Sequence, residues 1–207
     1  MVTLKSILKV CAPLMALAVS GSAFAQAPDY VRVRSMTYNG SGCPINSVAS
    51  NISPDRQAFT VLFSEYIAEV GPGVPFNQKR KNCQLVVSLD FPQGWSYSLA
   101  TVDYRGYVAL EPQVKGTQKS SYYFQGQGHT GTLQTVMFGP IDQNYQIRDT
   151  LGLGALVWSA CGAQRALNIN SQLILDNAAN PSAHGHLTTD SIDFQTKLIY
   201  GIRWKRC

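Results

Sequence analysis

Short stretches of alternating apolar and polar residues run through the chain, and the clearest lie between Lys81 and Leu110. From Leu85 to Phe91, apolar residues occupy every second position. Because successive side chains of a strand point to opposite faces, this pattern predicts a strand with one buried face. Pro92-Gln93-Gly94 then predicts a tight turn, after which the alternation resumes. We therefore expect a β-hairpin over residues 81–110, at the centre of the fold.

The alternation slips by one position at Ala100-Thr101, which predicts a β-bulge. A bulge re-aims side chains, so Asp103, Arg105 and Tyr107 are expected to project from one face. The expected binding surface consists of Asp103, Tyr104, Arg105 and Tyr107. The alternative is a solvated strand face with an ion pair between Asp103 and Arg105, an interaction that contributes little on a surface.

Further alternating segments recur along the chain, separated by turns rich in glycine, proline and asparagine. We expect a short helical turn over Ser64–Val70, a polar loop over Asp142–Thr150, and hardly any other helical periodicity. This pattern predicts an all-β fold, an antiparallel β-sandwich or jelly roll. The expected strands are Tyr30–Tyr38, Phe59–Phe63, Ser120–Phe124, Leu133–Phe138, Leu153–Trp158, Leu167–Leu175 and Ile192–Trp204.

Residues 1–25 are typical of a signal peptide: Lys5 and Lys9 precede an apolar run, and Ala23-Phe24-Ala25 forms a small-x-small cleavage site. We expect cleavage near Ala25-Gln26 and a single exported domain over residues 26–207. The apolar run is too short to remain as a membrane-spanning helix, and the rest of the sequence has no second long apolar run.

The number of cysteines outside the leader is also typical of an exported protein. Of five cysteines, Cys11 lies in the leader, which leaves four: Cys43, Cys83, Cys161 and Cys207. An even number in an exported chain predicts two disulfides, for which three connectivities are possible. We favour Cys43–Cys83 with Cys161–Cys207, which places one bridge in each half of the chain.

Charge argues against a nucleic-acid partner. The formal net charge of +5 falls to +3 when Lys5 and Lys9 leave with the signal peptide. The remaining basic residues are concentrated only at residues 79–81 and 203–206, whereas nucleic-acid-binding proteins usually carry a basic face. The expected partner is therefore a protein or a glycan.

Segments spread along the mature chain are similar to DUF4360, an uncharacterised family of small exported proteins of bacteria and fungi. The resemblance implies no activity and no catalytic residue. The matching segments are Cys43-Pro44, Phe59–Val61, Arg80–Leu85, Val102–Tyr107, Tyr122–Phe124, Leu156–Ser159, Cys161-Gly162, Leu167–Asn170, Asp190–Asp193 and Trp204–Cys207.

Few residues indicate catalysis. His184 and His186 are weak candidates for a metal site with Asp190 or Asp193, but no established metal-binding spacing surrounds them, so no metal or cofactor is expected. A nucleophile elbow and phosphate-binding glycine loops are absent from the sequence. Paired carboxylates could hydrolyse sugars; the candidates are Glu65, Glu69, Asp90, Asp103 and Glu111.

Tyrosines offer another possibility, since aromatic faces stack on sugar rings or anchor protein partners. Tyr97, Tyr104, Tyr107, Tyr122 and Tyr123 lie close in sequence. We therefore expect a cofactor-free binding protein of unknown ligand. The alternatives are a carbohydrate-binding module with exposed tyrosines and a secreted hydrolase with a carboxylate or Ser/His site.

Overall fold

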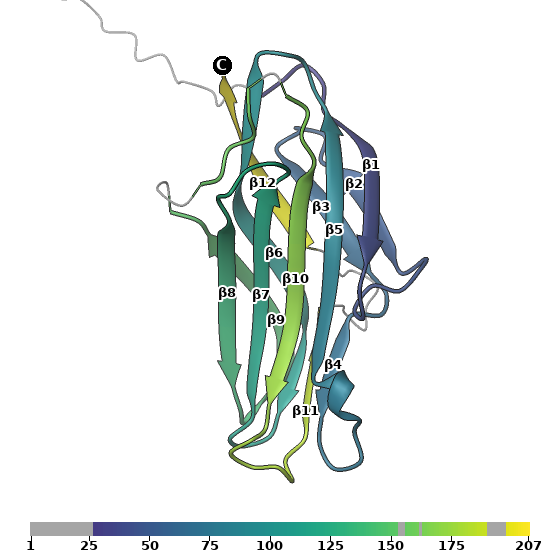
Figure 1. Cartoon of the computed structure of the whole chain (residues 1–207). Coiled ribbons are helices and arrows are strands. Elements are labelled where there is room, and N and C mark those ends of the chain that lie inside the picture. The colour runs from purple at the N-terminus through teal and green to yellow at the C-terminus, as the bar shows by residue number, and fades with distance from the viewer. Residues whose placement is uncertain (1–26, 153–155, 162, 190–197) are drawn as a thin grey trace, which may run out of the picture.

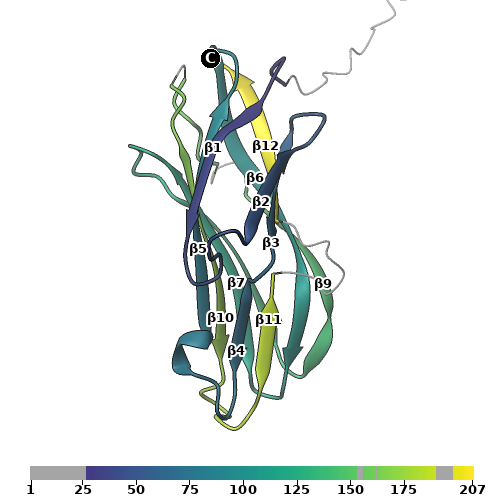
Figure 2. The same ribbon diagram turned by 90° about the vertical axis from the view of Figure 1, so that its right-hand side faces the viewer.

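The computed structural model describes residues 27–152, 156–161, 163–189 and 198–207. The described chain forms two antiparallel β-sheets that face each other across a shared core (Figures 1 and 2). The expected all-β sandwich is therefore confirmed. Residues 1–25, with the expected signal peptide and cleavage site, lie outside the described residues.

One sheet has five strands in the order β1-β5-β10-β7-β8, and it faces the viewer in Figure 1. Its central strands bury every second residue, as the alternation in the sequence requires. The strands are β1 (Arg32–Asn39), β5 (Arg80–Asp90), β10 (Leu167–Asp176), β7 (Lys115–Phe124) and β8 (Gly131–Phe138).

The other sheet has seven strands and is built around β6 (Trp95–Leu110). On one side, β6 pairs first with β12 (Leu198–Arg206) and then with β11 (Gly185–Thr188); on the other side it pairs with β9 (Ile141–Thr150). The remaining strands are β2 (Val48–Ile52), β3 (Ala58–Phe63) and β4 (Ile67–Val70). The one helical element in the described part is a 3-10 turn, η1 (Phe76–Gln78).

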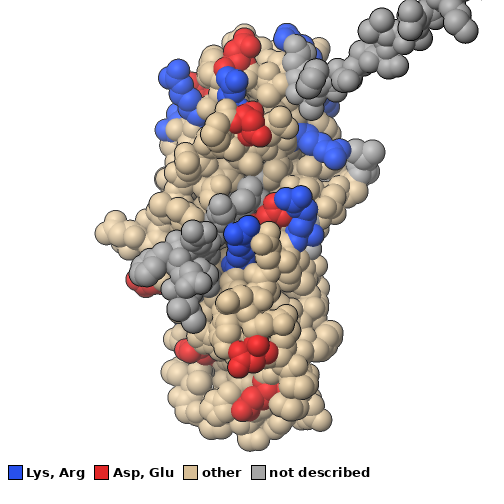
Figure 3. All heavy atoms as spheres, turned by 180° about the vertical axis from the view of Figure 1, so that it is seen from behind, with Lys and Arg blue, Asp and Glu red and all other residues tan. Residues whose placement is uncertain are grey.

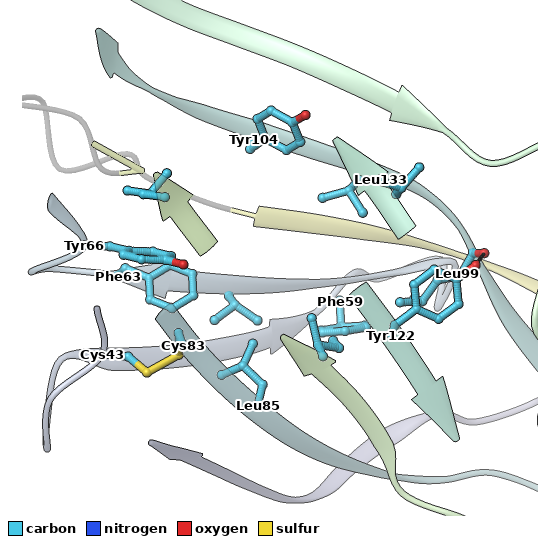
Figure 4. Packing of buried hydrophobic residues seen from close by; sticks show 14 of the residues in the cluster. Cys43, Phe59, Phe63, Tyr66, Cys83, Leu85, Leu99, Tyr104, Tyr122 and Leu133 are labelled. Atoms are coloured by element: carbon cyan, nitrogen blue, oxygen red, sulfur yellow. Dashed lines mark hydrogen bonds between the residues drawn. A yellow bond between two sulfur atoms is a disulfide. The ribbon is translucent and has the colours of Figure 1, made fainter. Parts of the chain in front are cut away.

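Side chains of both sheets meet in one core (Figure 4). Leu85 of β5 and Tyr122 of β7 reach it from one sheet, and Phe59 of β3, Leu99 and Tyr104 of β6 from the other. All five side chains are at most 1% exposed. Burial of such apolar surface is the main favourable contribution to folding.

The expected hairpin over residues 81–110 is wrong, although both of its strands exist. β5 pairs with β1 and β10, whereas β6 pairs with β12, β11 and β9, so the turn at Pro92–Gly94 carries the chain from one sheet to the other. Residues 95–100 of β6 are buried on both faces. A strand covered on both faces lies within the layers, and the alternation could not reveal which sheet it joins.

The expected bulge in β6 is confirmed. On β12, Gly201 pairs with Thr101 and the next residue, Ile202, pairs with Leu99, so Ala100 has no partner in this register. The unpaired residue shifts the buried parity from odd to even numbers, and Val102 and Tyr104 therefore face the core.

Three local predictions fail. Residues 67–70 form strand β4 instead of a helical turn, and residues 141–150 form strand β9 instead of a loop. The strand expected over Leu153–Trp158 is reduced, in its described part, to a single bridge between Trp158 and Ser98. β12 begins at Leu198, and the earlier part of the expected last strand lies outside the described residues.

Two disulfides close the fold, as expected for the four mature cysteines. Cys43, in the β1–β2 connection, joins Cys83 of β5 within the core (Figure 4). Cys161 joins Cys207 at the exposed C-terminus. The bridges span sequence separations of 40 and 46 residues, and each is expected to stabilise the fold by about 3–4 kcal/mol in the chain-entropy model.

Candidate functional site

Four connections meet at the end of the sandwich opposite the C-terminus (Figure 1). We call this region the loop end and define it by residues 71–79, 111–114, 139–140 and 177–184. Main-chain hydrogen bonds join three of these connections: Glu111 N donates to His184 O, and Gly139 N donates to Val114 O. These hydrogen bonds fix the connections of the loop end relative to one another. Connections placed on a rigid scaffold are where proteins commonly bind ligands.

A depression of about 370 Å³ opens at the loop end on the outer side of the seven-stranded sheet. Strand ends of β4, β6, β9 and β11 form its floor and walls. Its ionisable lining consists of three carboxylates and two imidazoles, from Glu69, Glu111, Asp142, His184 and His186.

Hydrogen bonds hold several of these groups in place. The Tyr107 hydroxyl donates to Asp142 Oδ1 at 2.5 Å, and His186 Nδ1 lies 3.2 Å from Glu69 Oε1. The rings of Tyr107 and His186 lie side by side, with centroids 6.1 Å apart. Asp142, Tyr107, His186 and Glu69 thus form a continuous row across β9, β6, β11 and β4, which we call the polar row.

Glu111 is oriented separately. Its Oε2 accepts a hydrogen bond of 2.6 Å from the His184 backbone N–H. A side chain on Gly71 would collide with the His184 ring, because a Cβ there would lie 2.4 Å from Nδ1. The glycine at this position therefore lets the β4–β5 connection close against His184.

The lining of the larger depression is opposite in charge to the whole chain, because it has three carboxylates and no Lys or Arg. Acidic residues gather at the lower end of the face in Figure 3, where Lys and Arg are absent from view, and basic residues lie on its middle and upper parts. The hydrogen bond to the Asp142 carboxylate raises the pKa of the Tyr107 hydroxyl. Tyr107 is therefore a neutral hydrogen-bonding group at physiological pH.

A second, smaller depression of about 230 Å³ adjoins the first, and both are lined by Glu69, Val70 and Val74. Phe76 of η1 stands at its edge with 79% of its surface exposed, and Lys79 Nζ lies 3.6 Å from the centre of its ring. An aromatic ring so exposed beside two depressions is available for contact with a ligand.

The structure separates the four residues of the expected binding surface. Asp103, Arg105 and Tyr107 share the outer face of β6, but Tyr104 is 1% exposed and its hydroxyl donates to Thr135 Oγ1 at 2.6 Å within the sandwich. The expected ion pair between Asp103 and Arg105 is replaced by a two-bond pair in which Arg148 of β9 donates to both Asp103 oxygens, at 2.5 and 2.7 Å. Of the four, Tyr107 reaches the polar row.

The tyrosines close in sequence divide in the same way. Tyr97, Tyr104 and Tyr122 are buried in the core, whereas Tyr123 is 38% exposed on the outer face of the five-stranded sheet. Three of these five tyrosines are therefore core residues, whose rings a ligand cannot reach.

The structure places some of the expected catalytic and metal-binding candidates together in the larger depression. Glu69 and Glu111 line the larger depression, whereas Glu65, Asp90 and Asp103 lie elsewhere. Both His184 and His186 line it too, while Asp190 and Asp193 lie outside the described residues. In the part of the chain that the structure describes, no three His, Cys, Asp or Glu side chains are grouped so as to hold a metal ion.

Sequence reasoning missed Asp142. It lies on β9, where Tyr145 is the one buried residue among those whose burial the structure describes, so the apolar alternation is weak. The apolar residues Tyr145 and Ile147, two positions apart, were the available signal that this segment is a strand.

A family model described as "Domain of unknown function (DUF4360)" matches residues 29–207. A protein of Arthroderma benhamiae (strain ATCC MYA-4681 / CBS 112371), described as an uncharacterized secreted protein, is 46% identical over 188 residues, which cover 91% of this chain and 76% of the relative.

Among solved structures, TmCBM61 in complex with β-1,4-galactotriose matches with a TM-score of 0.26 and 12% identity, covering 84% of this chain and 90% of that one. Among the described residues, no helix has the length and apolar character needed to cross a membrane.

Proposed function

The chain belongs to the DUF4360 family, and we propose that it is an exported protein that binds a glycan at the loop end of the sandwich. Three findings support export: the leader-like residues 1–25, the two disulfides, and the relative described as secreted. We further propose that residues 26–207 act as one domain.

The observation that carries the binding proposal is the depression of about 370 Å³ in which charged groups and imidazoles from three strands and two connections converge. Its volume lies in the range of roughly 300–1,000 Å³ common for small-ligand sites. Three of its side chains, Asp142, His186 and Glu69, already belong to the hydrogen-bonded polar row, so little conformational entropy is lost when a ligand binds them.

A sugar matches the chemistry of these groups. Its hydroxyls can donate to the carboxylates of Glu69, Glu111 and Asp142 and accept from an imidazole N–H. Hydrogen bonds to a charged partner are the stronger kind. The apolar faces of a sugar ring can lie against exposed aromatic carbons, which Phe76 offers in the smaller, adjoining depression.

Two glutamates four positions apart provide a matched test. Glu69 lines the depression, whereas Glu65 is exposed outside it. Glu69→Ala is expected to weaken binding of soluble oligosaccharides by about 10- to 100-fold, since a hydrogen bond to a charged group contributes roughly 1.5–3 kcal/mol. Glu65→Ala is expected to leave it unchanged, as measured by isothermal titration calorimetry against a panel of neutral and amino-sugar oligosaccharides.

Binding that is equal in the wild type and both variants would place the site elsewhere, and the absence of binding to the whole panel would refute the proposal. Asp142→Asn provides a second variant, because it replaces the charged acceptor of the Tyr107 hydroxyl with a neutral amide oxygen while keeping the size of the side chain.

Hydrolysis is a second candidate, favoured by the presence of Glu69, Glu111 and Asp142 in one depression. Glycosidases use two carboxylates on either side of the scissile bond. Release of reducing ends from the same oligosaccharides, abolished by Glu69→Gln or Glu111→Gln, would support this candidate over simple binding.

A further inference from the structure

The outer face of the five-stranded sheet carries a line of uncharged polar side chains that crosses every strand. Opposite one another in register are Asn39 of β1, Gln84 of β5, Asn170 of β10, Ser121 of β7 and Thr132 of β8. The residues next to them in the chain, such as Leu85, Ile169 and Tyr122, are buried, so the line points outward. We call it the amide line, after the three amides on its first three strands.

Side-chain hydrogen bonds fix the central amides. Asn170 Nδ2 donates to Gln84 Oε1 at 3.1 Å, and Gln172 Nε2 donates to Asn170 Oδ1 at 3.0 Å. Arg80 Nη2 in turn donates to Gln172 Oε1 at 2.7 Å. Each amide is oriented by its neighbour, and each still has a donor or acceptor free for another partner.

A parallel line lies beside this one and is also nearly uncharged. Gln172 stands opposite Asn82 on one side and Lys119 on the other, and Lys119 stands opposite Gln134. Neither line contains an Asp or Glu. These two lines therefore lack the carboxylates that line the larger depression at the loop end.

On the other side of the amide line, the surface becomes partly apolar. Tyr123, Asn168 and Val86 stand opposite one another there, and Tyr123 is 38% exposed. Amides beside aromatic and aliphatic carbons match a sugar ring, which has hydroxyls at its edge and C–H groups on its faces.

We propose that this face binds an extended, uncharged polysaccharide that runs across the strands. Strands lie about 4.8 Å apart, so an amide line on five strands spans roughly 19 Å, enough to contact several sugar units of one chain. Figure 1 shows these five strands side by side, with β10 in the middle of the sheet. The oriented amides reduce the entropy lost on binding.

The chemistry of the face favours this occupant over a protein. The centres of protein interfaces are enriched in aromatic and apolar side chains, whereas the centre here consists of Gln84 and Asn170. It also favours an uncharged polymer, because the two lines offer one lysine and no carboxylate, and the Arg80 guanidinium beside them is already hydrogen-bonded to Gln172.

The test uses the full mature protein and three insoluble polymers: microcrystalline cellulose, chitin and a β-1,3-glucan. The variant Gln84→Ala/Asn170→Ala removes the two central amides, and Tyr123→Ala removes the aromatic flank. The control Gln57→Ala/Gln93→Ala removes two exposed amides in the β2–β3 and β5–β6 connections, outside both lines. Thermal unfolding of each variant establishes that it is folded.

Retention of the wild type and the control on at least one polymer is expected, with at least tenfold weaker retention of folded Gln84→Ala/Asn170→Ala and of Tyr123→Ala. The polymer that retains the protein identifies whether N-acetylated or plain sugars are recognised. No retention on any of the three, or equal retention of all variants, would overturn the inference.

This face and the loop end are separate surfaces, so their tests fail independently. Glu69→Ala is expected to keep the retention on insoluble polymer, and Gln84→Ala/Asn170→Ala is expected to keep the affinity for soluble oligosaccharides. A loss of both activities in either variant would contradict the assignment of two sites.

Discussion

Tyr97 is a polar side chain enclosed by aromatic rings in the core. Its ring centre lies 5.0 Å from that of Phe124, 5.4 Å from Trp204 and 5.5 Å from Phe91. Its hydroxyl has no hydrogen-bond partner in the described part of the chain. Burial without a partner favours the neutral form and raises the pKa of Tyr97 far above its ordinary value.

Tyr122, also 1% exposed, donates its hydroxyl to the Leu99 carbonyl at 3.2 Å. Burial raises the pKa of Tyr122 to about 12. In the unfolded chain both phenols ionise near pH 10, as ordinary tyrosines do. Between these values the folded state holds protons that the unfolded state releases, so the stabilising contribution is complete below about pH 10 and is lost as the pH rises through about 12.

We therefore expect the free energy of unfolding to decrease above pH 10, with each such tyrosine contributing about 1.4 kcal/mol per pH unit. Urea unfolding at a series of pH values from 8 to 12 measures this slope. Tyr97→Phe is expected to make the slope shallower, and to leave stability at pH 8 unchanged or higher, because it removes an unpartnered hydroxyl. A slope that Tyr97→Phe does not alter would show that Tyr97 does not contribute.

At the scale of the elements, β6 holds the seven-stranded sheet together because it changes partner along its length. It pairs with β12 up to Tyr104 and with β11 from Val108. Gly106 lies between these two segments, opposite Tyr145 of β9. The Tyr145 hydroxyl donates to Thr188 O at 2.6 Å, so it reaches past β6 to the end of β11. The absence of a side chain on Gly106 allows this contact.

Gly106→Ala is accordingly expected to destabilise the fold. The added Cβ would lie 2.1 Å from Thr188 O and 2.8 Å from the Tyr145 hydroxyl, so strands or side chains must shift. The expected loss in the free energy of unfolding is about 1–3 kcal/mol, as for other overpacked sites. Gly128→Ala, which meets nothing within 4 Å, is the control in urea unfolding. Equal stability of both variants would contradict the packing described for Gly106.

Central strands with one clean buried face, such as β5 and β10, could be predicted from the sequence because their alternation follows directly from the core. β4 and β9 could not: β4 has only four residues, and β9 pairs on one side with β6 and presents mostly polar residues. The pairing of β5 and β6 with other strands could not be predicted either, because the residues at Pro92–Gly94 suit a turn within one sheet as well as a crossing between two sheets.

For the candidate site too, individual residues could be predicted from the sequence but their arrangement could not. Glu69, Glu111, His184, His186 and Tyr107 each attracted attention in the sequence, but for separate reasons. Their convergence depends on the register of β4, β11, β6 and β9, where His186 stands between Glu69 and Ala109. Such long-range pairings have no local signal in a single sequence.

At the scale of the whole molecule, the two disulfides fix different regions. Cys43 and Cys83 are buried, whereas Cys161 and Cys207 are exposed at the end opposite the loop end. One bridge therefore contributes to the packing of the core, and the other fastens the C-terminus.

We expect Cys161→Ser/Cys207→Ser to lower the free energy of unfolding by about 3–4 kcal/mol while leaving oligosaccharide affinity unchanged. Cys43→Ser/Cys83→Ser is expected to cost more, because it also places two serine hydroxyls in the core. Urea unfolding and calorimetry on both variants check this. A loss of affinity in the Cys161→Ser/Cys207→Ser variant, under conditions where it is folded, would show that the C-terminal end takes part in binding.

The most direct test of the central claim is a titration of ¹⁵N-labelled mature protein with the soluble oligosaccharide that binds best, followed by amide chemical shifts. We expect the largest shifts at Glu69, Tyr107, Asp142 and His186, with small shifts at the C-terminal end. Shifts concentrated around Cys161 and Cys207, with none in the polar row, would contradict the assignment of the loop end as the glycan site.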